Sequence, residues 1–334
     1  MTRAIALFSG GLDSILACRV VARQGIDVVA VKFVTPFFDY DLLHRPSYAL
    51  EIKERYGIEV MVHDVSAEYL TLLRAPGHGY GKHFNPCLDC KIFMMTKARE
   101  LMAEMGASFL ISGEVLGQRP MSQRRDALRV VERDSGCDKI LLRPLCAKHL
   151  NPTKPELDGL VDRDQLCDFS GRSRSRQIAL AREMGITGYP TPAGGCVLTD
   201  LTVSQRIKRY YGEHDTVGVA DMRLLLVGRQ FALPGGGWLV MGRSEEENLQ
   251  VLALLEPEDM MLKLVDRPGP AAVLRNLRDA CDLEAAAGVV ARYGKKGPDG
   301  QPMPGQVQCQ GQDGLTTLIE GTPPAEADLR GWLR

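Results

Sequence analysis

The residues with the clearest chemical meaning stand near the start of the chain, in Ser9-Gly10-Gly11-Leu12-Asp13-Ser14. They follow an apolar run at 4–8 and open an amphipathic segment at 13–24, which predicts a strand, a glycine turn and a helix. Two glycines let successive backbone N–H groups converge, and the helix start adds its positive dipole end. Ser9 and Ser14 offer hydroxyl donors, and Asp13 can hold a Mg²⁺ that bridges phosphate oxygens. The stretch predicts a phosphate or pyrophosphate site, with an ordinary strand-to-helix turn as the alternative.

The stretch at 9–14 matches neither of two common phosphate-binding loops. It lacks the closing Gly-Lys-Ser/Thr of a Walker A loop and the G-x-G-x-x-G spacing of a dinucleotide-binding turn. It resembles the SGGxDS signature of the PP-loop ATP pyrophosphatases at every fixed position. That resemblance implies cleavage of ATP between the α- and β-phosphates, and therefore adenylyl transfer rather than kinase chemistry.

The resemblance also implies an ATP site that draws on the loop and on positions further along the chain. Asp13 takes a catalytic role, with Mg²⁺ as its metal ion. The ATP-binding residues that we assign on this basis are Ser9, Gly10, Gly11, Leu12, Asp13, Ser14, Lys32, Ser112, Gly113 and Gln118.

Strands and helices alternate at short intervals through the first part of the chain. Strands are predicted at 28–34, 58–65 and 107–111, and a helix at 48–56 that ends at Gly57. This order predicts an α/β fold with a doubly wound parallel sheet and ligands at the carboxyl ends of its strands. The PP-loop resemblance implies the same fold, of the adenine nucleotide α-hydrolase-like kind.

Three cysteines form the second chemical feature. Residues 75–90 contain three glycines and two prolines and are predicted as a loop, which carries Cys87 and Cys90 just before a helix at about 91–105. Thiols at a helix start are expected to have lowered pKa values and to be good nucleophiles or metal ligands. A third cysteine, Cys196, follows the glycine pair 194–195, which allows close backbone approach to a bulky group.

Two uses of Cys87, Cys90 and Cys196 stay open, besides a structural zinc site with His83 as fourth ligand. One cysteine could carry sulfur as a persulfide that another resolves, as in PP-loop thiolases with paired cysteines. Alternatively, three thiolates could hold a [4Fe–4S] cluster with one iron open to sulfide, the arrangement that resembles the cluster-dependent tRNA thiolases. We favour the cluster and assign all three cysteines as catalytic and as metal ligands. The remaining cysteines are predicted to be buried small hydrophobes: Cys18, Cys137, Cys146, Cys167, Cys281 and Cys309.

Two further segments carry a more specific resemblance. Residues 112–123, which follow the fourth predicted strand, are similar to the TGESLGQVASQ segment of the tRNA 4-thiouridine synthases of the ThiI family. Residues 139–145 are similar to that family's strand ending in Arg-Pro. The chain departs from the family at Arg119 and Pro120, where small apolar residues are usual.

A basic run, Arg172, Arg174 and Arg176, lies at the entry to a helix that ends at Gly185. A solvated helix face is one interpretation of this run. A face that contacts RNA phosphates is the other.

The chain beyond a predicted helix at 202–211 is richer in strands and turns. A hairpin is predicted through Gly235–Gly237, and Ser244 with Glu247 forms a capping box that starts a helix. The order G-R-x-x-x-x-N, D-x-P-G and an Ala-rich helix ending near Arg292 resembles the RNA-binding domain of the NFACT proteins. Met261 and Lys263 stand where that domain has Trp and His. Residues that could line a phosphate-binding face, or be ordinary exposed polar groups, are Arg243, Asn248, Arg267, Arg275, Lys295 and Lys296.

Bulk composition sets limits on these interpretations. The chain has 334 residues, enough for two domains, and its net charge of −1 means that any nucleic-acid surface must be a local patch. Nine cysteines in a cytoplasmic chain favour metal or sulfur chemistry over disulfides. No apolar run approaches twenty residues and the start leads into a strand, so we expect a cytoplasmic protein with no membrane partner. The predicted domains are 1–204 for ATP binding and sulfur transfer, 205–221 for a linker helix, 222–312 for a smaller α+β RNA-binding domain, and 313–334 for a loosely ordered tail.

The function that these features predict is ATP-dependent tRNA sulfur transfer. A uridine carbonyl oxygen would be adenylated, and sulfur from the three-cysteine site would replace it. The expected partners are tRNA and an external sulfur donor, a cysteine desulfurase or inorganic sulfide, and a homodimer is allowed for. Two alternatives remain: a PP-loop ligase or amidotransferase for a small molecule, and a non-catalytic RNA-binding factor.

Overall fold

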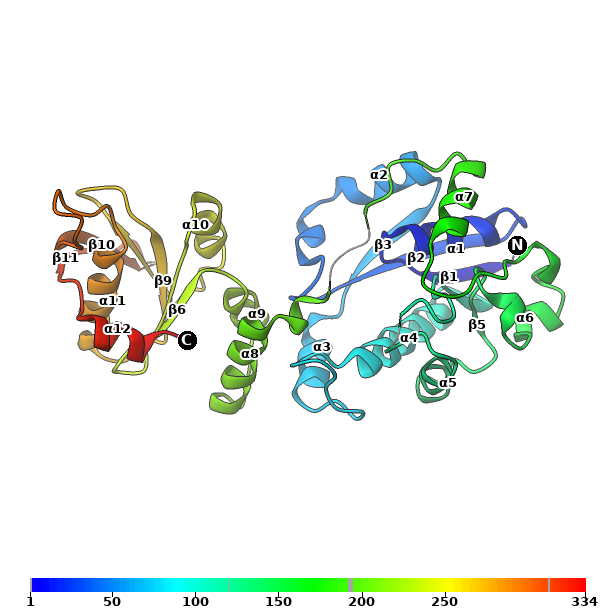
Figure 1. The fold of residues 1–334 in the computed structure, drawn as a ribbon, viewed down its shortest axis with the longest axis horizontal. Coiled ribbons are helices and arrows are strands. Elements are labelled where there is room, and N and C mark those ends of the chain that lie inside the picture. Colours follow the sequence, from blue (N-terminus) through cyan, green and yellow to red (C-terminus); the bar gives the residue numbers. More distant parts are fainter. Residues whose placement is uncertain (1, 120, 192–194, 312) are drawn as a thin grey trace. The chain divides into compact units, whose positions relative to one another are not determined.

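A computed structural model describes residues 2–119, 121–191, 195–311 and 313–334 (Figure 1). The chain divides into two compact units, Met1–Gln205 and Arg206–Arg334. Each unit has its own sheet and its own core, and each is described by itself.

The first unit is built on a parallel five-stranded sheet, as the sequence predicts. The strand order is β3-β2-β1-β4-β5, and every neighbouring pair is parallel. The chain winds outward from β1 through β2 and β3 and then crosses to β4, so the winding reverses direction between β1 and β4. Ligands of such sheets bind at this switch point, beyond the carboxyl ends of the strands. The strands are β1 Arg3–Leu7, β2 Asp27–Val34, β3 Glu59–Asp64, β4 Phe109–Ser112 and β5 Leu141–Leu142.

Helices cover both faces of this sheet. Helices α1, α2 and α7 pack over one face, and α3, α4 and α5 lie on the other (Figure 1). The helices of this unit are α1 Leu12–Ala22, α2 Ser47–Tyr56, α3 Ser66–Arg74, α4 Cys87–Glu104, α5 Arg125–Asp134, α6 Lys154–Leu157 and α7 Ser175–Glu183, with short 3-10 turns η1 Tyr40–His44, η2 Ala147–His149, η3 Arg163–Gln165 and η4 Val197–Thr199.

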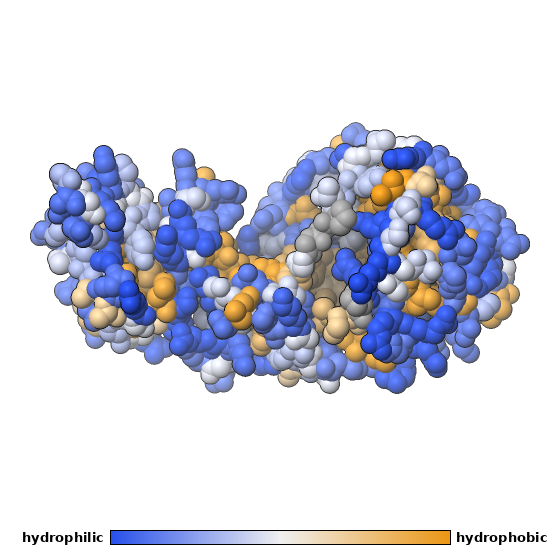
Figure 2. Space-filling view, viewed as in Figure 1, coloured by the Kyte–Doolittle hydropathy of each residue, from blue (hydrophilic) through white to orange (hydrophobic). Residues whose placement is uncertain are grey.

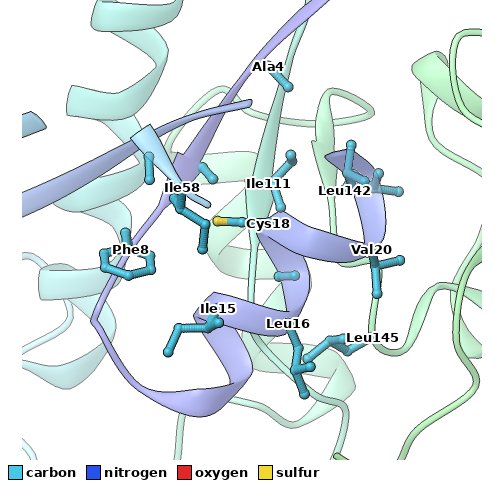
Figure 3. Close-up of a cluster of buried hydrophobic side chains, with 14 of the residues drawn as sticks. Ala4, Phe8, Ile15, Leu16, Cys18, Val20, Ile58, Ile111, Leu142 and Leu145 are labelled. Carbon is cyan, nitrogen blue, oxygen red and sulfur yellow. The ribbon is translucent and has the colours of Figure 1, made fainter. Parts of the chain in front are cut away.

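The core beneath α1 fixes where the glycine turn lies. Alternate residues of β1 point to opposite faces, so Ala4 joins this core and the equally buried Ile5 faces the other side. The small alanine lets α1 lie close to the strand, with Ile15 and Cys18 among the side chains that fill the contact (Figure 3). Burial raises the pKa of the Cys18 thiol to about 12, so this cysteine is a small hydrophobe, as predicted.

The second unit is an α+β domain with a six-stranded antiparallel sheet, again as predicted. The strand order is β11-β10-β8-β9-β7-β6. The predicted hairpin connects β6 to β7, and the buried carboxylate of Asp282 accepts the N–H groups of Gly235 and Gly237, both at 2.7 Å. The elements are α8 Leu201–Glu213, α9 Val219–Leu225, β6 Arg229–Ala232, β7 Trp238–Met241, α10 Glu245–Leu252, β8 Met260–Leu264, β9 Ala271–Arg275, α11 Ala280–Arg292, β10 Gly305–Gly311, β11 Thr316–Gly321 and α12 Glu326–Trp332.

Two parts of this unit differ from the sequence expectations. The expected tail at 313–334 contains β11, which pairs along β10, and α12, whose Leu329 is buried in the core. Strand β11 lies at the sheet edge and is largely exposed, so it lacks the alternation that would have predicted a strand. Residues 223–228, expected among strands and turns, instead complete α9 and then turn at Gly228, where φ is 64°.

Hydrophilic side chains dominate the face drawn in Figure 2, and hydrophobic residues gather there only in small patches. None of the helices formed by the described residues is long and apolar enough to cross a membrane.

Candidate nucleotide and thiol site

The glycine turn between β1 and α1 has the conformation that the sequence requires. Gly10 has a φ of 80°, which a side chain would strain, and Gly11 forms the start of α1. The Ser14 hydroxyl donates to the Gly11 carbonyl at 2.8 Å, and the Gly11 N–H donates to the Ser9 hydroxyl at 3.3 Å. These bonds hold the loop and the positive end of α1 at the switch point of the sheet, where an anion is expected to bind.

Lys32 supports this loop from the neighbouring strand. Its ammonium group is buried, donates to the Ser9 carbonyl at 2.7 Å and pairs with Asp39 at 2.5 Å. The positive charge is therefore matched within the protein and fixes the first residue of the loop. An ATP contact for Lys32 stays a prediction.

Gly113, directly after β4, lies against the backbone of Asp13 and Ser14. A Cβ added at Gly113 would lie 2.7 Å from the carbonyl carbon of Asp13 and from the nitrogen of Ser14. Only glycine lets the segment after β4 pack against the first turn of α1. The sequence placed Gly113 among the ATP-binding residues, and the structure gives it this packing role.

We expect Gly113→Ala to weaken ATP binding by about 10- to 100-fold, because such overpacking costs about 1–3 kcal/mol and must displace the start of α1. Isothermal titration calorimetry with ATP measures this. Gly212→Ala is the control, because a methyl group there meets open space. Equal affinities for the two variants would show that the close packing at Gly113 does not shape the nucleotide site.

The Asp13 carboxylate lies at the centre of a polar network. Its Oδ2 accepts from Gln118 Nε2 at 2.8 Å and from Arg174 Nη2 at 3.3 Å, and Gln177 in turn donates to Gln118 Oε1 at 2.9 Å. Its Oδ1 is buried and has no hydrogen-bond partner among the described residues. A buried, unpartnered carboxylate oxygen beside an anion-binding loop fits a Mg²⁺ ligand.

Arg174 is a residue of the candidate site that the sequence analysis predicted only as part of a basic run. The basic run was interpreted as a solvated face or an RNA face, whereas Arg174 points to Asp13 with only 22% of its side chain exposed. The hydrogen bond from the Gly171 N–H to the Leu116 carbonyl, at 2.8 Å, ties the segment before α7 to the segment after β4. The sequence showed only that the basic run lies at a helix start. That position could not identify Asp13, 161 residues away, as the partner of Arg174.

One cavity of about 380 Å³ joins the loop to Cys90. It brings Cys90 together with most of the residues that the sequence assigned to ATP, and adds Lys91, Glu114 and Arg119. Gln118 contributes through its bond to Asp13. The lining residues are Leu7, Phe8, Ser9, Asp13, Ser14, Val31, Lys32, Phe33, Phe38, Asp39, Cys90, Lys91, Met94, Ser112, Gly113, Glu114, Arg119 and Gln123.

Cys87 and Cys90 lie within the first turn of α4, not in the loop before it. The helix begins at Cys87 because the preceding Pro86 ends the loop, so the helix start predicted at about 91 was one turn too late. Cys196 is exposed and stands directly before η4. Cys87 and Cys90 share one turn of α4, and the proximity of Cys196 to them stays a prediction. Gly194, of the glycine pair before Cys196, and Pro120 lie outside the described residues.

The thiol pKa values are raised, which corrects the expectation from the helix start. Burial raises the pKa of Cys90 to about 11 and also raises that of Cys87, although Lys91 and Arg119 act in the opposite direction on Cys87. Removal from water outweighs the helix dipole here. Among the other cysteines, Cys281 is exposed on α11 and was wrongly predicted to be buried.

The three thiols fit a metal centre by the kind of donor they offer. Thiolates are the ligands of zinc and of iron–sulfur clusters, and one of the three cysteines, Cys90, lines the cavity beside the loop. Among the residues that the structure describes, however, no three His, Cys, Asp or Glu side chains form a ready metal-binding group. His83 is exposed, with a φ of 59°.

A histidine anchors the loop that leads to Cys87. Its ring, at His78, contacts Asp89 at 3.0 Å through Nδ1 and Asp134 at 3.1 Å through Nε2, and its backbone N–H also donates to Asp89. Asp89 stands between the two cysteines in the sequence, and its side chain is buried. The loop, the C-x-x-C turn and α5 are therefore held together around one imidazole.

A buried ion pair connects the two segments that resemble the ThiI family. Glu114 Oε2 accepts from Arg143 Nε at 3.0 Å, both side chains are buried, and Arg143 also binds Glu132. Burial acts to raise the pKa of Glu114, but the charges of Lys91 and Arg143 outweigh it and the pKa is lowered. Arg143 thus fixes a cavity-lining carboxylate from outside the cavity.

Only part of the phosphate-binding face predicted in the second unit is available to a ligand. Arg275 is buried against Asp259 and Asp221, and Arg267 donates to backbone carbonyls of 303 and 304, so both are structural. Arg243, Lys295 and Lys296 are exposed. A polar cavity of about 250 Å³ lies beside the start of α10 and is lined by Arg229, Gly242, Arg243, Ser244, Glu245, Asn248, Gly269, Pro270 and Tyr293.

Fold and site together define the architecture: a doubly wound α/β unit with a cavity lined by the glycine loop and Cys90, followed in the sequence by an antiparallel α+β unit. Residues 1–151 match the family model described as Thiamine biosynthesis protein (ThiI). Residues 228–333 match the model described as NFACT protein RNA binding domain. Both resemblances that the sequence analysis stated are confirmed.

Curated relatives match part of the chain. A probable tRNA sulfurtransferase of Thermococcus kodakarensis is 27% identical over 143 residues, which is 43% of this chain and 36% of that protein. The tRNA-specific 2-thiouridylase MnmA of Azorhizobium caulinodans is 28% identical over 150 residues, 40% of this chain and 37% of that protein. The chain thus spans little more than a third of the length of these relatives.

Solved structures with partial similarity include a 4-thiouridine synthetase–RNA complex with bound ATP. That structure has a TM-score of 0.39 and 19% identity, over 67% of this chain and 52% of the other. The U34-tRNA thiolase NcsA from Methanococcus maripaludis, with its [4Fe-4S] cluster, has a TM-score of 0.35 and 16% identity, over 68% and 70%.

Proposed function

We propose that this protein is an ATP-dependent tRNA sulfurtransferase. A uridine carbonyl oxygen attacks the α-phosphate of ATP, pyrophosphate leaves, and sulfur from the thiol site then displaces AMP together with that oxygen. The curated relatives support tRNA sulfur modification as the general activity. The adenylation step and the sulfur route are the finer parts of the proposal.

One observation carries the proposal: Cys90 lines the same cavity as Ser9, Asp13 and Ser14. Adenylation alone needs the loop and no thiol. Sulfur delivery to an adenylated base needs a sulfur atom on the wall of the cavity where the base was activated, because the leaving AMP and the entering sulfur share one carbon. A small-molecule ligase would leave the cysteines without a role.

Activation of the base relies on positive charge around the phosphates. The loop amides and the start of α1 face the anion, and Arg174 brings a guanidinium next to Asp13. Mg²⁺ on Asp13 would neutralise charge on the departing pyrophosphate. Arg174 donates to Oδ2 of Asp13, which leaves Oδ1 available to the metal ion. The chemistry needs positioning and charge more than a strong base.

The sulfur would be held at Cys87, Cys90 and Cys196. A [4Fe–4S] cluster on these thiolates would supply an iron that binds sulfide, and a persulfide on one of them is the alternative. In both cases this chain contributes the thiolates and the nearby cations Lys91 and Arg119. An external donor supplies the sulfur.

The second unit supports the choice of RNA as substrate. It matches a domain described as RNA binding, and its polar cavity carries Arg229 and Arg243 next to a helix start. Phosphate groups are the natural ligands of such a site. The tRNA would be held there while its target base enters the cavity of the first unit.

The test is release of AMP and pyrophosphate from ATP, with and without bulk tRNA. We expect release to depend on tRNA and to fall about 10- to 100-fold in Arg174→Ala, the usual cost of a lost charged hydrogen bond. Arg172→Ala removes an equally charged, exposed neighbour and is expected to stay within about twofold of the parent.

Two results would contradict the proposal. Release that is the same without tRNA favours a small-molecule ligase. Absence of AMP under all conditions, with tRNA still bound, favours a non-catalytic RNA-binding factor.

A further inference from the structure

The first unit has a second large cavity, which we call the α5 cavity. Its volume is about 390 Å³, close to that of the nucleotide cavity, and the two share no lining residue in the described part of the chain. The α5 cavity lies at the β5 edge of the parallel sheet, between α5 and residues 147–157, which include α6 (Figure 1). Its walls combine leucines with four basic residues, which are Arg125, Arg129, Lys139 and Arg143.

Helix α5 contributes two arginines from one face. Arg125 and Arg129 both line the cavity and stand about one helical turn apart, about 6 Å along the axis. The Arg125 guanidinium donates to the His149 carbonyl at 2.9 Å. The Arg129 side chain is exposed, and no hydrogen bond or ion pair joins it to another described residue. Arg129 is therefore available to an anion.

A lysine lines the cavity from the turn just before β5. Lys139 has a φ of 65°, a conformation that side chains disfavour, and its carbonyl accepts the N–H of Lys154 at 2.7 Å. That bond ties the turn to the start of α6 and so keeps the lysine at the cavity. The Lys139 ammonium is exposed and makes no ion pair with any described residue.

The cavity is also lined by a buried guanidinium with one nitrogen that is not engaged. Arg143 is 1% exposed, its Nε donates to Glu114, and its Nη1 pairs with Glu132. Its Nη2 is buried and has no partner among the described residues. A buried donor without a partner costs free energy, so an acceptor oxygen that reached it would be stabilised.

The charges around the cavity leave an excess of positive charge. Of the three acids in its described lining, Glu132 and Glu156 already pair with arginines, and Asp138 alone remains against three exposed basic residues. The net charge of the chain is −1, so a nucleic-acid surface must be a local excess of this kind. The basic residues stand on two walls, α5 and the turn before β5, which neighbouring phosphates of one strand can contact together.

We propose that the α5 cavity binds phosphate groups of an RNA backbone. Arg129 and Lys139 contact the phosphates, and Nη2 of Arg143 is the buried donor for a phosphate oxygen. That the RNA is the substrate tRNA rests on the proposed function. The site holds RNA on the first unit and takes no part in the chemistry at the glycine loop.

The test is the double variant Arg129→Gln/Lys139→Gln, with fluorescently labelled bulk tRNA and anisotropy as the measure of Kd. We expect Kd to rise about 5- to 30-fold, as for two lost exposed ion pairs. The slope of log Kd against log salt concentration should fall by about 2, because each lost phosphate contact removes about one. The control, Lys53→Gln/Arg182→Gln, removes the same charge from exposed positions on α2 and α7 and should stay within about twofold of the parent. Equal effects of the two double variants would overturn the site.

A second readout locates the RNA on the parent protein. With an amine-reactive acetyl ester and peptide mass spectrometry, saturating tRNA is expected to protect Lys139 and not Lys53. Inorganic phosphate at the same concentration of phosphate groups is expected to protect neither. Protection of Lys139 by inorganic phosphate but not by tRNA would make the cavity a site for free phosphate, and no protection at all would also overturn the proposal. If the parent binds tRNA but releases no AMP, the proposed function fails, and these two measurements still decide whether the α5 cavity binds RNA.

Discussion

Cys90→Ser is expected to abolish thiolation and to leave adenylation nearly intact. Cys90 is the thiol that lines the cavity of the PP-loop, so an oxygen in its place can neither carry sulfur nor act as a soft metal ligand. Loss of such a central group typically costs about 1000-fold or more in rate. The loop and Arg174 are unchanged in this variant, and ATP should still release AMP when tRNA is present.

The measurement is thiolated nucleoside in digested tRNA by mass spectrometry, with AMP quantified in the same reaction. Cys281→Ser is the control, because that cysteine is exposed and lies in the second unit. It is expected to stay within about twofold of the parent. Thiolation by Cys90→Ser at the parental rate would place the sulfur route elsewhere.

Glu114→Gln is expected to have the largest effect on stability. The change removes one of the two carboxylates that pair with the buried Arg143, and breaking a buried ion pair typically costs about 3–5 kcal/mol. Urea denaturation followed by circular dichroism measures the change in the free energy of unfolding. Glu104→Gln, at the exposed end of α4, is the control and is expected to change it by less than about 0.5 kcal/mol.

The Glu114 pair also predicts a dependence on pH. The pKa of Glu114 is lowered in the folded protein. Its contribution to the free energy of unfolding is therefore fully present above the pKa of the unfolded state, about 4.3, and is lost as the pH falls through the pKa of the folded state. The stability difference between the parent and Glu114→Gln should therefore be constant near neutral pH and shrink in acid. A difference that stays constant down to pH of about 3 would show that Glu114 is not held as a carboxylate.

The local parts of the site could be predicted from the sequence. The turn at Ser9–Ser14 could be predicted because glycines followed by a helix start are local signals. The alternation of strands and helices predicted the parallel sheet. The grouping of the C-x-x-C turn with Cys196 comes from the resemblance to thiolases and stays a prediction. The family models confirm both resemblances that were drawn from these segments.

The remaining parts depend on contacts between distant segments. Arg174 belonged to a basic run that looked like a surface, and only the approach of the segment before α7 to the loop gives it a carboxylate partner. The raised thiol pKa values follow from burial, which spacing alone does not reveal.

The most direct test of the central claim is a single reaction of the purified, anaerobically prepared protein with ATP, Mg²⁺, inorganic sulfide and bulk tRNA. AMP and thiolated nucleoside are both quantified in the same reaction. The proposed function predicts that both appear in equal amounts, and that a Cys87, Cys90 and Cys196 triple Ala variant still releases AMP but makes no thiolated nucleoside. Normal thiolation by the triple variant would contradict the claim that one cavity joins ATP activation to sulfur delivery.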